Sequence, residues 1–161
     1  MSVSKKSVND DLLRLTVQIA TVERSLSFES LIKKTVKYFS LELVECSESV
    51  VVRVVDLEES RDVNLCFRGI DQATNVLAFT SGDSKFSLPN HLGDLVVCGP
   101  LVLLEAAKYQ IPPCSRLCHL VTHGLLHLAG FDHDTKENSK VMEAIEINIL
   151  NQIGIDNPYN E

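Results

Sequence analysis

Long apolar runs are missing from this 161-residue sequence. No stretch approaches the roughly 20 consecutive apolar residues that a helix needs to span a bilayer, so we expect no membrane segment. The basic pair Lys5-Lys6 is not followed by an apolar segment, and we therefore expect no secretory signal. Repeats, low-complexity tracts and linkers rich in Gly, Pro or Ser are also absent from the sequence. We expect a single domain over residues 1–161, large enough to bury a hydrophobic core.

The cysteines do not form the pattern of a disulfide framework. Their number is odd and they are scattered among apolar residues, at Cys46, Cys66, Cys98, Cys114 and Cys118. This distribution predicts reduced thiols and a cytoplasmic protein. Cys114 and Cys118 are one helical turn apart, but no two further ligands lie nearby in the sequence. We interpret them as core or boundary thiols rather than as a metal pair.

Positive charge is also scarce. The chain has 15 Lys and Arg residues against 22 Asp and Glu residues, a net charge of -7. Residues 130–161 hold 7 acidic residues and 2 lysines, so most of the excess negative charge lies at the C-terminal end. The overall field would repel a polyanion, and a nucleic-acid partner would therefore need a local basic patch.

Strand and helix periodicities interleave along the chain and predict an α/β (α+β) fold, a mixed, mostly parallel sheet of about four strands covered by helices, with a central metal-binding helix. We expect strands at residues 12–19, 49–55, 74–79 and 92–98. Helices are expected from Ser27 through Phe39, from Asp56 to near Gly69, over residues 100–109, from Pro113 onward, and after Asp134. A polar loop at residues 80–90 is of the kind that borders a site.

Two of these helices carry more detailed predictions. Asp56 and Glu59 would cap the helix that runs from Asp56 to near Gly69. Its buried side would consist of Leu57, Val63, Leu65, Cys66 and Phe67. Asp134 and Glu137 would form a capping box for the last helix, and its apolar face would consist of Val141, Met142, Ile145 and Ile149.

Four of the five histidines lie within residues 119–133. His123 and His127 are four residues apart, so on a helix both imidazoles project from one face. Gly130 follows where a glycine can take the left-handed conformation that ends a helix, and His133 can return from the loop to the same point. This spacing predicts a three-histidine metal site with an open position for water.

The same spacing of three histidines and a glycine occurs in the metzincin proteases, which bind zinc. Those enzymes carry a glutamate base directly after the first histidine, whereas this sequence has Gly124. A peptidase acting by that mechanism would lack its proton acceptor. A phosphodiester suits the remaining chemistry, because a metal and a guanidinium can hold the charge that develops on phosphoryl oxygens.

Three blocks of sequence resemble the YbeY family of metal-dependent endoribonucleases. The first is His123-Gly-x-Leu-His127-Leu-x-Gly130-Phe-Asp132-His133, which is similar to the signature of that family. The second is Arg68-Gly-Ile-Asp71-Gln-Ala-Thr74-Asn75-Val-Leu-Ala-Phe79, and the third is Leu92-Gly-Asp94-Leu-Val. The blocks cover residues 50–159 in order. Phe131 stands where the family commonly has Tyr, and Ala78 where it commonly has Ser.

The resemblance implies an enzyme that cuts single-stranded RNA in ribosomal RNA maturation and quality control. It implies that His123, His127 and His133 bind one Zn²⁺ ion and that Arg68 contacts the RNA backbone. Arg68 also has a case of its own, because it sits at a predicted helix end beside a polar loop, and a guanidinium is the group best matched to phosphate. A surface arginine that favours a helix C-terminus is the alternative.

Further polar residues near the blocks have more than one possible role. His119 shares the helix face, but a fourth ligand would close the site, and we favour a supporting or packing role. Asp94 and Asp132 would either orient an imidazole or cap a turn. His91 is a loop histidine to which the sequence assigns no partner.

Two other functions remain open at this stage. One is another metallohydrolase, such as a peptidase or esterase, which the protease-like spacing favours and Gly124 disfavours. The other is a ribosome-associated binding factor in which zinc is structural. Because the chain is acidic, a ribosomal protein or GTPase partner that supplies positive charge is expected under either of the RNA-related functions.

Overall fold

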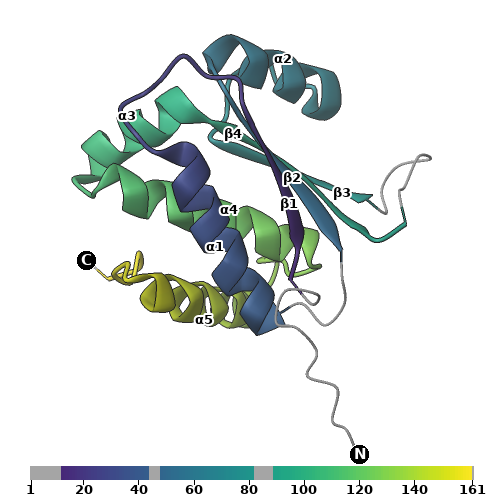
Figure 1. The fold of residues 1–161 in the computed structure, drawn as a ribbon, viewed down its shortest axis with the longest axis vertical. Coiled ribbons are helices and arrows are strands. Elements are labelled where there is room, and N and C mark those ends of the chain that lie inside the picture. Colours follow the sequence, from purple (N-terminus) through teal and green to yellow (C-terminus); the bar gives the residue numbers. More distant parts are fainter. Residues whose placement is uncertain (1–11, 44–47, 82–88, 161) are drawn as a thin grey trace, which may run out of the picture.

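The computed structural model describes residues 12–43, 48–81 and 89–160 and has the predicted alternation of strands and helices (Figure 1). In chain order the elements are β1 (Arg14–Ile19), α1 (Phe28–Leu43), β2 (Ser49–Val55), α2 (Leu57–Arg68), β3 (Val76–Thr80), β4 (His91–Cys98), α3 (Gly99–Tyr109), α4 (Pro113–Leu128) and α5 (Lys136–Ile153). Of the predicted polar loop at 80–90, residues 82–88 lie outside the described residues.

The four strands form one sheet in the order β1-β2-β4-β3. β1, β2 and β4 are parallel, while β3 runs antiparallel to β4 at one edge. The prediction of a mixed, mostly parallel sheet of about four strands is confirmed. β3 begins two residues later than expected, because Thr74 and Asn75 use their polar groups in contacts with Ser60 and Glu105.

One face of the sheet is buried under helices, and α4 is the helix at its centre. α4 packs against α1, α3, α5, β3 and β4. Alternate residues of β2, namely Val50, Val52 and Val54, are fully buried in this interface, as the two-residue period of a strand requires. The other face is more open, with Thr16 and Gln18 exposed. The core therefore holds α4 rigidly against the sheet, which matters because α4 carries three histidines.

Helix α2 packs in a different orientation from the one predicted. Its buried residues are Ser60 and Asn64, whereas four of the five residues expected to be buried are exposed, namely Leu57, Leu65, Cys66 and Phe67. The cause is a set of hydrogen bonds. The Ser60 hydroxyl donates to the Thr74 carbonyl and accepts from the Thr74 amide. The Asn64 side-chain amide donates to the Gln72 carbonyl at 2.7 Å. These bonds fix the chain that follows α2 and leave its apolar residues facing solvent.

The predicted caps are partly wrong. Asp56 does occupy the N-cap position of α2, but its carboxylate accepts hydrogen bonds from Thr21 and from the Val22 amide instead of capping the helix. At α5 the N-cap residue is Thr135, whose hydroxyl accepts a hydrogen bond from the Asn138 amide. The capping box predicted at Asp134 and Glu137 is therefore one residue too early in the sequence. The apolar face of α5 was also partly misassigned, because Val141 is 53% exposed while Met142 and Ile149 are buried.

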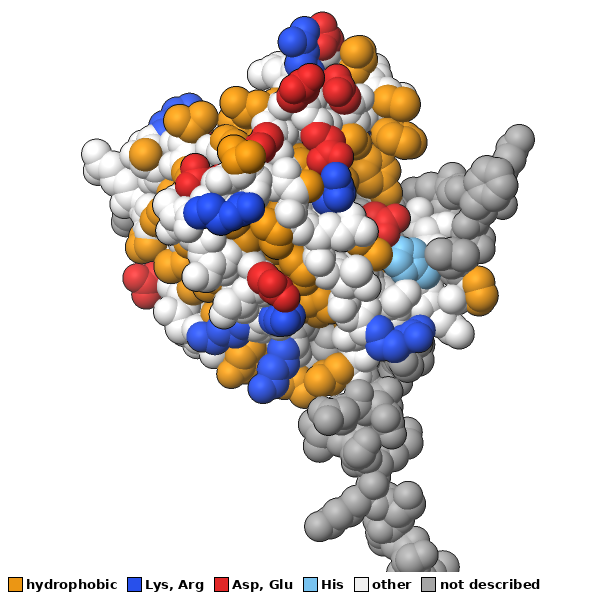
Figure 2. All heavy atoms as spheres, turned by 45° about the horizontal axis from the view of Figure 1, so that its top comes forward, with side chains coloured by type: hydrophobic (Ala, Val, Ile, Leu, Met, Phe, Trp, Pro, Cys, Tyr) orange, Lys and Arg blue, Asp and Glu red, His pale blue; other side chains and the backbone are white. Residues whose placement is uncertain are grey.

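The face of the molecule shown in Figure 2 mixes charges of both signs with apolar side chains. Cys66, Cys98, Cys114 and Cys118 are free thiols, and Cys98 and Cys118 are buried. Cys46 lies outside the described residues. In the part of the chain that the structure describes, every helix is too short or too polar to cross a membrane.

Candidate metal centre

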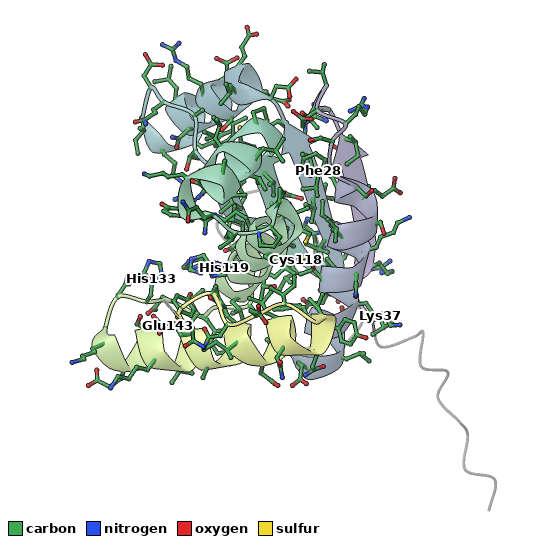
Figure 3. The ribbon with its side chains drawn as sticks, turned by 90° about the vertical axis from the view of Figure 1, so that its left-hand side faces the viewer. Phe28, Lys37, Cys118, His119, His133 and Glu143 are labelled. Carbon is green, nitrogen blue, oxygen red and sulfur yellow. The ribbon has the colours of Figure 1, made fainter. Side chains whose placement is uncertain are left out.

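The centre is built on one face of α4. Pro113 is the first residue of the helix, where its missing N–H costs no hydrogen bond. His119, His123 and His127 follow at intervals of four residues and therefore project from the same side. The helix ends at Leu128, and Gly130 adopts a φ of +94°, which turns the chain back. His133 is thus carried to the side of the molecule on which His119 lies, above α5 (Figure 3).

The structure brings the three predicted ligands to one point. One ring nitrogen each from His123, His127 and His133 lies within 4.8 Å of the other two. The Nε2 atoms of His123 and His127 are 3.1 Å apart, close to the separation of about 3.3 Å expected for two nitrogens on one tetrahedral zinc ion at about 2.05 Å. His123 and His127 are half-buried and His133 is exposed, so one side of the point is open. The donor set fits a zinc-type ion with a free position.

Glu146 on α5 supports His123 from behind, and the sequence analysis missed it. Its carboxylate is fully buried and accepts a hydrogen bond from His123 Nδ1 at 2.6 Å. That bond fixes the proton on Nδ1 and leaves the lone pair of Nε2 facing the other ligands. The available signal was an acidic residue within the apolar positions Met142, Ile149 and Leu150 of a predicted helix.

The same carboxylate binds two further groups. His119 Nε2 donates to it at 3.0 Å, and the Tyr159 hydroxyl donates to it as well. His119 and Tyr159 also meet edge to face, with ring centroids 5.5 Å apart. His119 thus supports the centre through Glu146, in line with the predicted supporting role. Tyr159, near the C-terminus, had no signal in the sequence.

The electrostatics favour a charged carboxylate at Glu146 and a neutral imidazole at His127. Burial acts to raise the pKa of Glu146, but hydrogen bonds from His119, His123 and Tyr159 outweigh it and lower the pKa to about 2. The pKa of His127 is lowered mainly by burial of its side chain, and also by the neighbouring His123 and His133. A neutral imidazole is the form that binds a metal. Burial and the Glu146 carboxylate together raise the pKa of the Tyr159 hydroxyl, which keeps it a donor.

Gly124 faces the sheet, and this explains the absence of the protease base. A Cβ atom on Gly124 would lie 2.8 Å from Cδ2 of Leu95, a fully buried residue of β4. Leu95 thus occupies the space that a side chain at position 124 would need, and a glutamate would be forced into an apolar core. The packing of α4 on β4 is incompatible with the metzincin mechanism.

Arg68 lies in the same cleft as the histidines. The cleft has a volume of about 760 Å³, and its lining includes Arg68 of α2, Ala78 of β3, and His123 and His127 of α4. Arg68 Nη2 donates to the Ala78 carbonyl at 3.0 Å. This contact uses only backbone of residue 78, so Ala in place of the family's common Ser leaves it intact.

A second arginine, Arg116, also lines the cleft and was not singled out from the sequence. It forms an ion pair with Glu105 at 2.9 Å, and Glu105 in turn accepts a bond from the Asn75 amide. Its guanidinium lies 5.4 Å from the centre of the Tyr109 ring. The charge of Arg116 is therefore compensated within the protein, whereas Arg68 has no carboxylate partner among the residues that the structure describes.

The remaining sequence candidates lie away from the metal point. His91 has two partners, Ser49 at 2.6 Å and Asp94 at 3.0 Å, so Asp94 orients the imidazole of His91 and not that of a ligand. Asp132 accepts from the Asn138 side chain and the Asp134 amide, which is the turn role. Phe131 packs against the core through its ring.

Comparisons with known proteins agree with this geometry. The family model described as Endoribonuclease YbeY matches residues 15–154. A relative named Endoribonuclease YbeY from Acinetobacter baylyi is 42% identical over 123 residues, which are 73% of this chain and 77% of the relative. One of the same name from Methylococcus capsulatus is 45% identical over 113 residues, 70% of this chain and 75% of the relative. The solution structure of TM1509 from Thermotoga maritima superposes with a TM-score of 0.55 at 24% identity, over 91% of this chain and 100% of that one, and supports the fold.

Proposed function

This chain belongs to the YbeY family of endoribonucleases, and from that premise we propose that its three-histidine centre binds one Zn²⁺ ion and cleaves phosphodiester bonds in single-stranded RNA. Ribosomal RNA is the substrate we propose, in its maturation and in ribosome quality control. The observation that carries the proposal is the shared cleft, in which His123 and His127 lie together with Arg68. Histidine ligands and a guanidinium in one cleft suit the negative charge of a phosphodiester.

Each residue of the centre has a distinct task in this reaction. A zinc ion bound by His123, His127 and His133 supplies Lewis-acid chemistry and activates a nucleophile at neutral pH. Glu146 holds the proton on His123 Nδ1 and so keeps the Nε2 lone pair available. Arg68 offers its remaining N–H groups to the scissile phosphate, where a charge-assisted bond grows stronger as negative charge develops.

A cleavage assay with an arginine control tests the proposal. Zinc-loaded protein is expected to cut single-stranded RNA and to stop when a chelator is added. Arg68→Ala should lower the cleavage rate by roughly 10²–10³, the range for loss of one transition-state donor. Arg61→Ala is the matched control, because Arg61 lies on the same helix but is already paired with Asp71. The proposal fails if metal-loaded protein cuts no single-stranded RNA and Arg68→Ala changes nothing measurable.

The ends of the RNA products distinguish the two possible nucleophiles. A cyclic phosphate, or a 2′- or 3′-phosphate, means that the ribose 2′-hydroxyl attacked. A 5′-phosphate with a 3′-hydroxyl means that water attacked. Mass spectrometry of the products of a short oligoribonucleotide separates these outcomes.

A ribosome-associated binding factor is the second candidate function, because the net charge of -7 makes unaided RNA binding weak. In that case zinc would be structural, and a ribosomal protein or GTPase would supply positive charge. A His127→Ala variant that stays folded, still binds ribosomal particles and no longer cleaves RNA would favour the enzyme. Either function places the protein in the cytoplasm, in keeping with the free thiols of Cys98, Cys114 and Cys118.

A further inference from the structure

A pair of phenylalanines lies beside Arg68, and one of them is exposed. Phe67, on α2, is 66% exposed. Its ring meets that of Phe79, on β3, edge to face with centroids 5.1 Å apart. Phe67 belongs to α2, and on the face of the molecule that Figure 2 shows, apolar side chains stand among charged ones. Phe79 contacts the Phe67 ring, and most of the surface of the Phe67 residue is open to solvent.

Phe79 also connects this ring to the guanidinium of the cleft. The Arg68 guanidinium lies 5.7 Å from the centre of the Phe79 ring, within the range of a cation–π contact. Phe67, Phe79 and Arg68 thus form one cluster, and Arg68 is the member of it that lines the cleft. Phe67 is adjacent in sequence to the residue that we assign to the scissile phosphate.

The charge around the cluster favours an anionic chain as the occupant. Arg61 and Arg116 both have carboxylate partners. Arg68 has no such partner within residues 12–43, 48–81 and 89–160 and bonds only a backbone carbonyl. A cation without a carboxylate, next to an open aromatic ring, combines the two groups with which proteins hold single-stranded nucleic acid: one for the backbone and one for a base.

We propose that Phe67 is a base-stacking site, which holds a base of single-stranded RNA next to the phosphate at Arg68. This inference rests on the proposed function and adds a binding residue to it. Stacking on a phenyl ring accepts all four bases, so the site selects unpaired RNA without selecting a sequence. A base inside a duplex is already stacked and cannot offer its face. The site thus gives a physical basis for a preference for single strands.

Steady-state cleavage by the zinc-loaded protein tests the site. Phe67→Ala should lower kcat/KM for an unstructured oligoribonucleotide by roughly five- to 150-fold, the range reported by alanine substitution for one stacked base. The loss should appear mainly in KM, because the stacked base is not the reacting group. Phe67→Tyr should restore kcat/KM to within about twofold, since the ring is kept. Leu57→Ala is the matched control, an exposed apolar residue on the same helix.

Oligonucleotides with one abasic position identify the base that is held. At one position near the cut, the missing base should cost the wild-type enzyme as much as Phe67→Ala does, and it should cost the variant nothing more. Equal kcat/KM for Phe67→Ala and wild type overturns the proposal, and a shift in sedimentation of that variant would then mark the ring as a contact between copies of the chain. If wild-type protein cleaves no RNA at all, the proposed function itself fails, which is a different result.

Discussion

Glu146 stabilises the histidine centre through hydrogen bonds, although it is not one of the three predicted ligands. It is a fully buried carboxylate with three donors around it: His119, His123 and Tyr159. A charge buried in this way is stable only while its donors stay in place. The carboxylate therefore ties α5 and the C-terminal Tyr159 to the face of α4 that carries the histidines.

Glu146→Gln should weaken metal binding by roughly 10- to 100-fold, the usual cost of losing a carboxylate behind a histidine ligand. The amide carries no charge, and it can present either its oxygen or its NH2 group to His123 Nδ1, so it fixes the proton on Nδ1 less well than a carboxylate. Competition with a chromophoric chelator measures the affinity. Glu137→Gln, in the exposed first turn of α5, is the control and should bind zinc as the wild type does. Equal affinities for the two variants would contradict the role assigned to Glu146.

The cysteines offer a second test at this scale. Burial raises the pKa of the Cys98 and Cys118 thiols, and both side chains are closed to reagents. The exposed Cys66 should be alkylated by iodoacetamide at least about tenfold faster than either, because thiolate fraction and access both control the rate. Peptide mass spectrometry of the native protein resolves the three sites. Alkylation of Cys118 at the rate of Cys66 would mean that the core opens readily.

Sequence could predict that three histidines meet, because they lie close together along the chain. A helical period and one glycine were enough to bring His123, His127 and His133 to one point. Glu146 is 23 residues beyond His123 and Tyr159 is 40 beyond His119. Their approach depends on how α5 packs on α4, which no local pattern encodes.

At the scale of elements, α2 shows why an amphipathic pattern can mislead. Its apolar residues suggested a buried face, but Ser60 and Asn64 form the better interface because they satisfy the backbone of residues 72–74. An unpaired buried backbone group costs about 1–3 kcal/mol. Sequence could predict that this helix starts after Asp56 and ends at Gly69, where φ is +71°. It could not predict which side faces inward, because that depends on the path of the loop that follows the helix and bonds to Ser60 and Asn64.

The contact of α4 with β4 yields a prediction for Gly124→Glu. Introducing the protease-type base places a charged side chain against the fully buried Leu95, with its Cβ only 2.8 Å from Cδ2. We expect the free energy of unfolding to fall by about 3 kcal/mol or more, from overpacking together with burial of a polar group. Urea denaturation measures the loss. The variant should show no peptidase activity, and a stable variant that hydrolyses peptides would refute this account of position 124.

At the scale of the whole molecule, the negative net charge disfavours RNA binding, whereas the positive charge of Arg68 in the cleft favours it. The chain carries -7 overall, and the described cleft offers Arg68 as its uncompensated cation, since Arg116 is paired with Glu105. We therefore expect this chain to hold RNA by a few specific contacts in the cleft, and the proposed protein partner would supply further positive charge.

The salt dependence of RNA binding measures how few those contacts are. For single strands, each phosphate contact adds about -0.7 to the slope of log affinity against log salt concentration. One or two contacts predict a slope between about -0.7 and -1.4 for this protein, and Arg68→Ala should bring it closer to zero by about 0.7. Fluorescence anisotropy of a labelled oligoribonucleotide at several salt concentrations gives both values. A slope steeper than about -3 would require more than four phosphate contacts, which the described cleft cannot provide, and would place most of the RNA interface elsewhere on the chain.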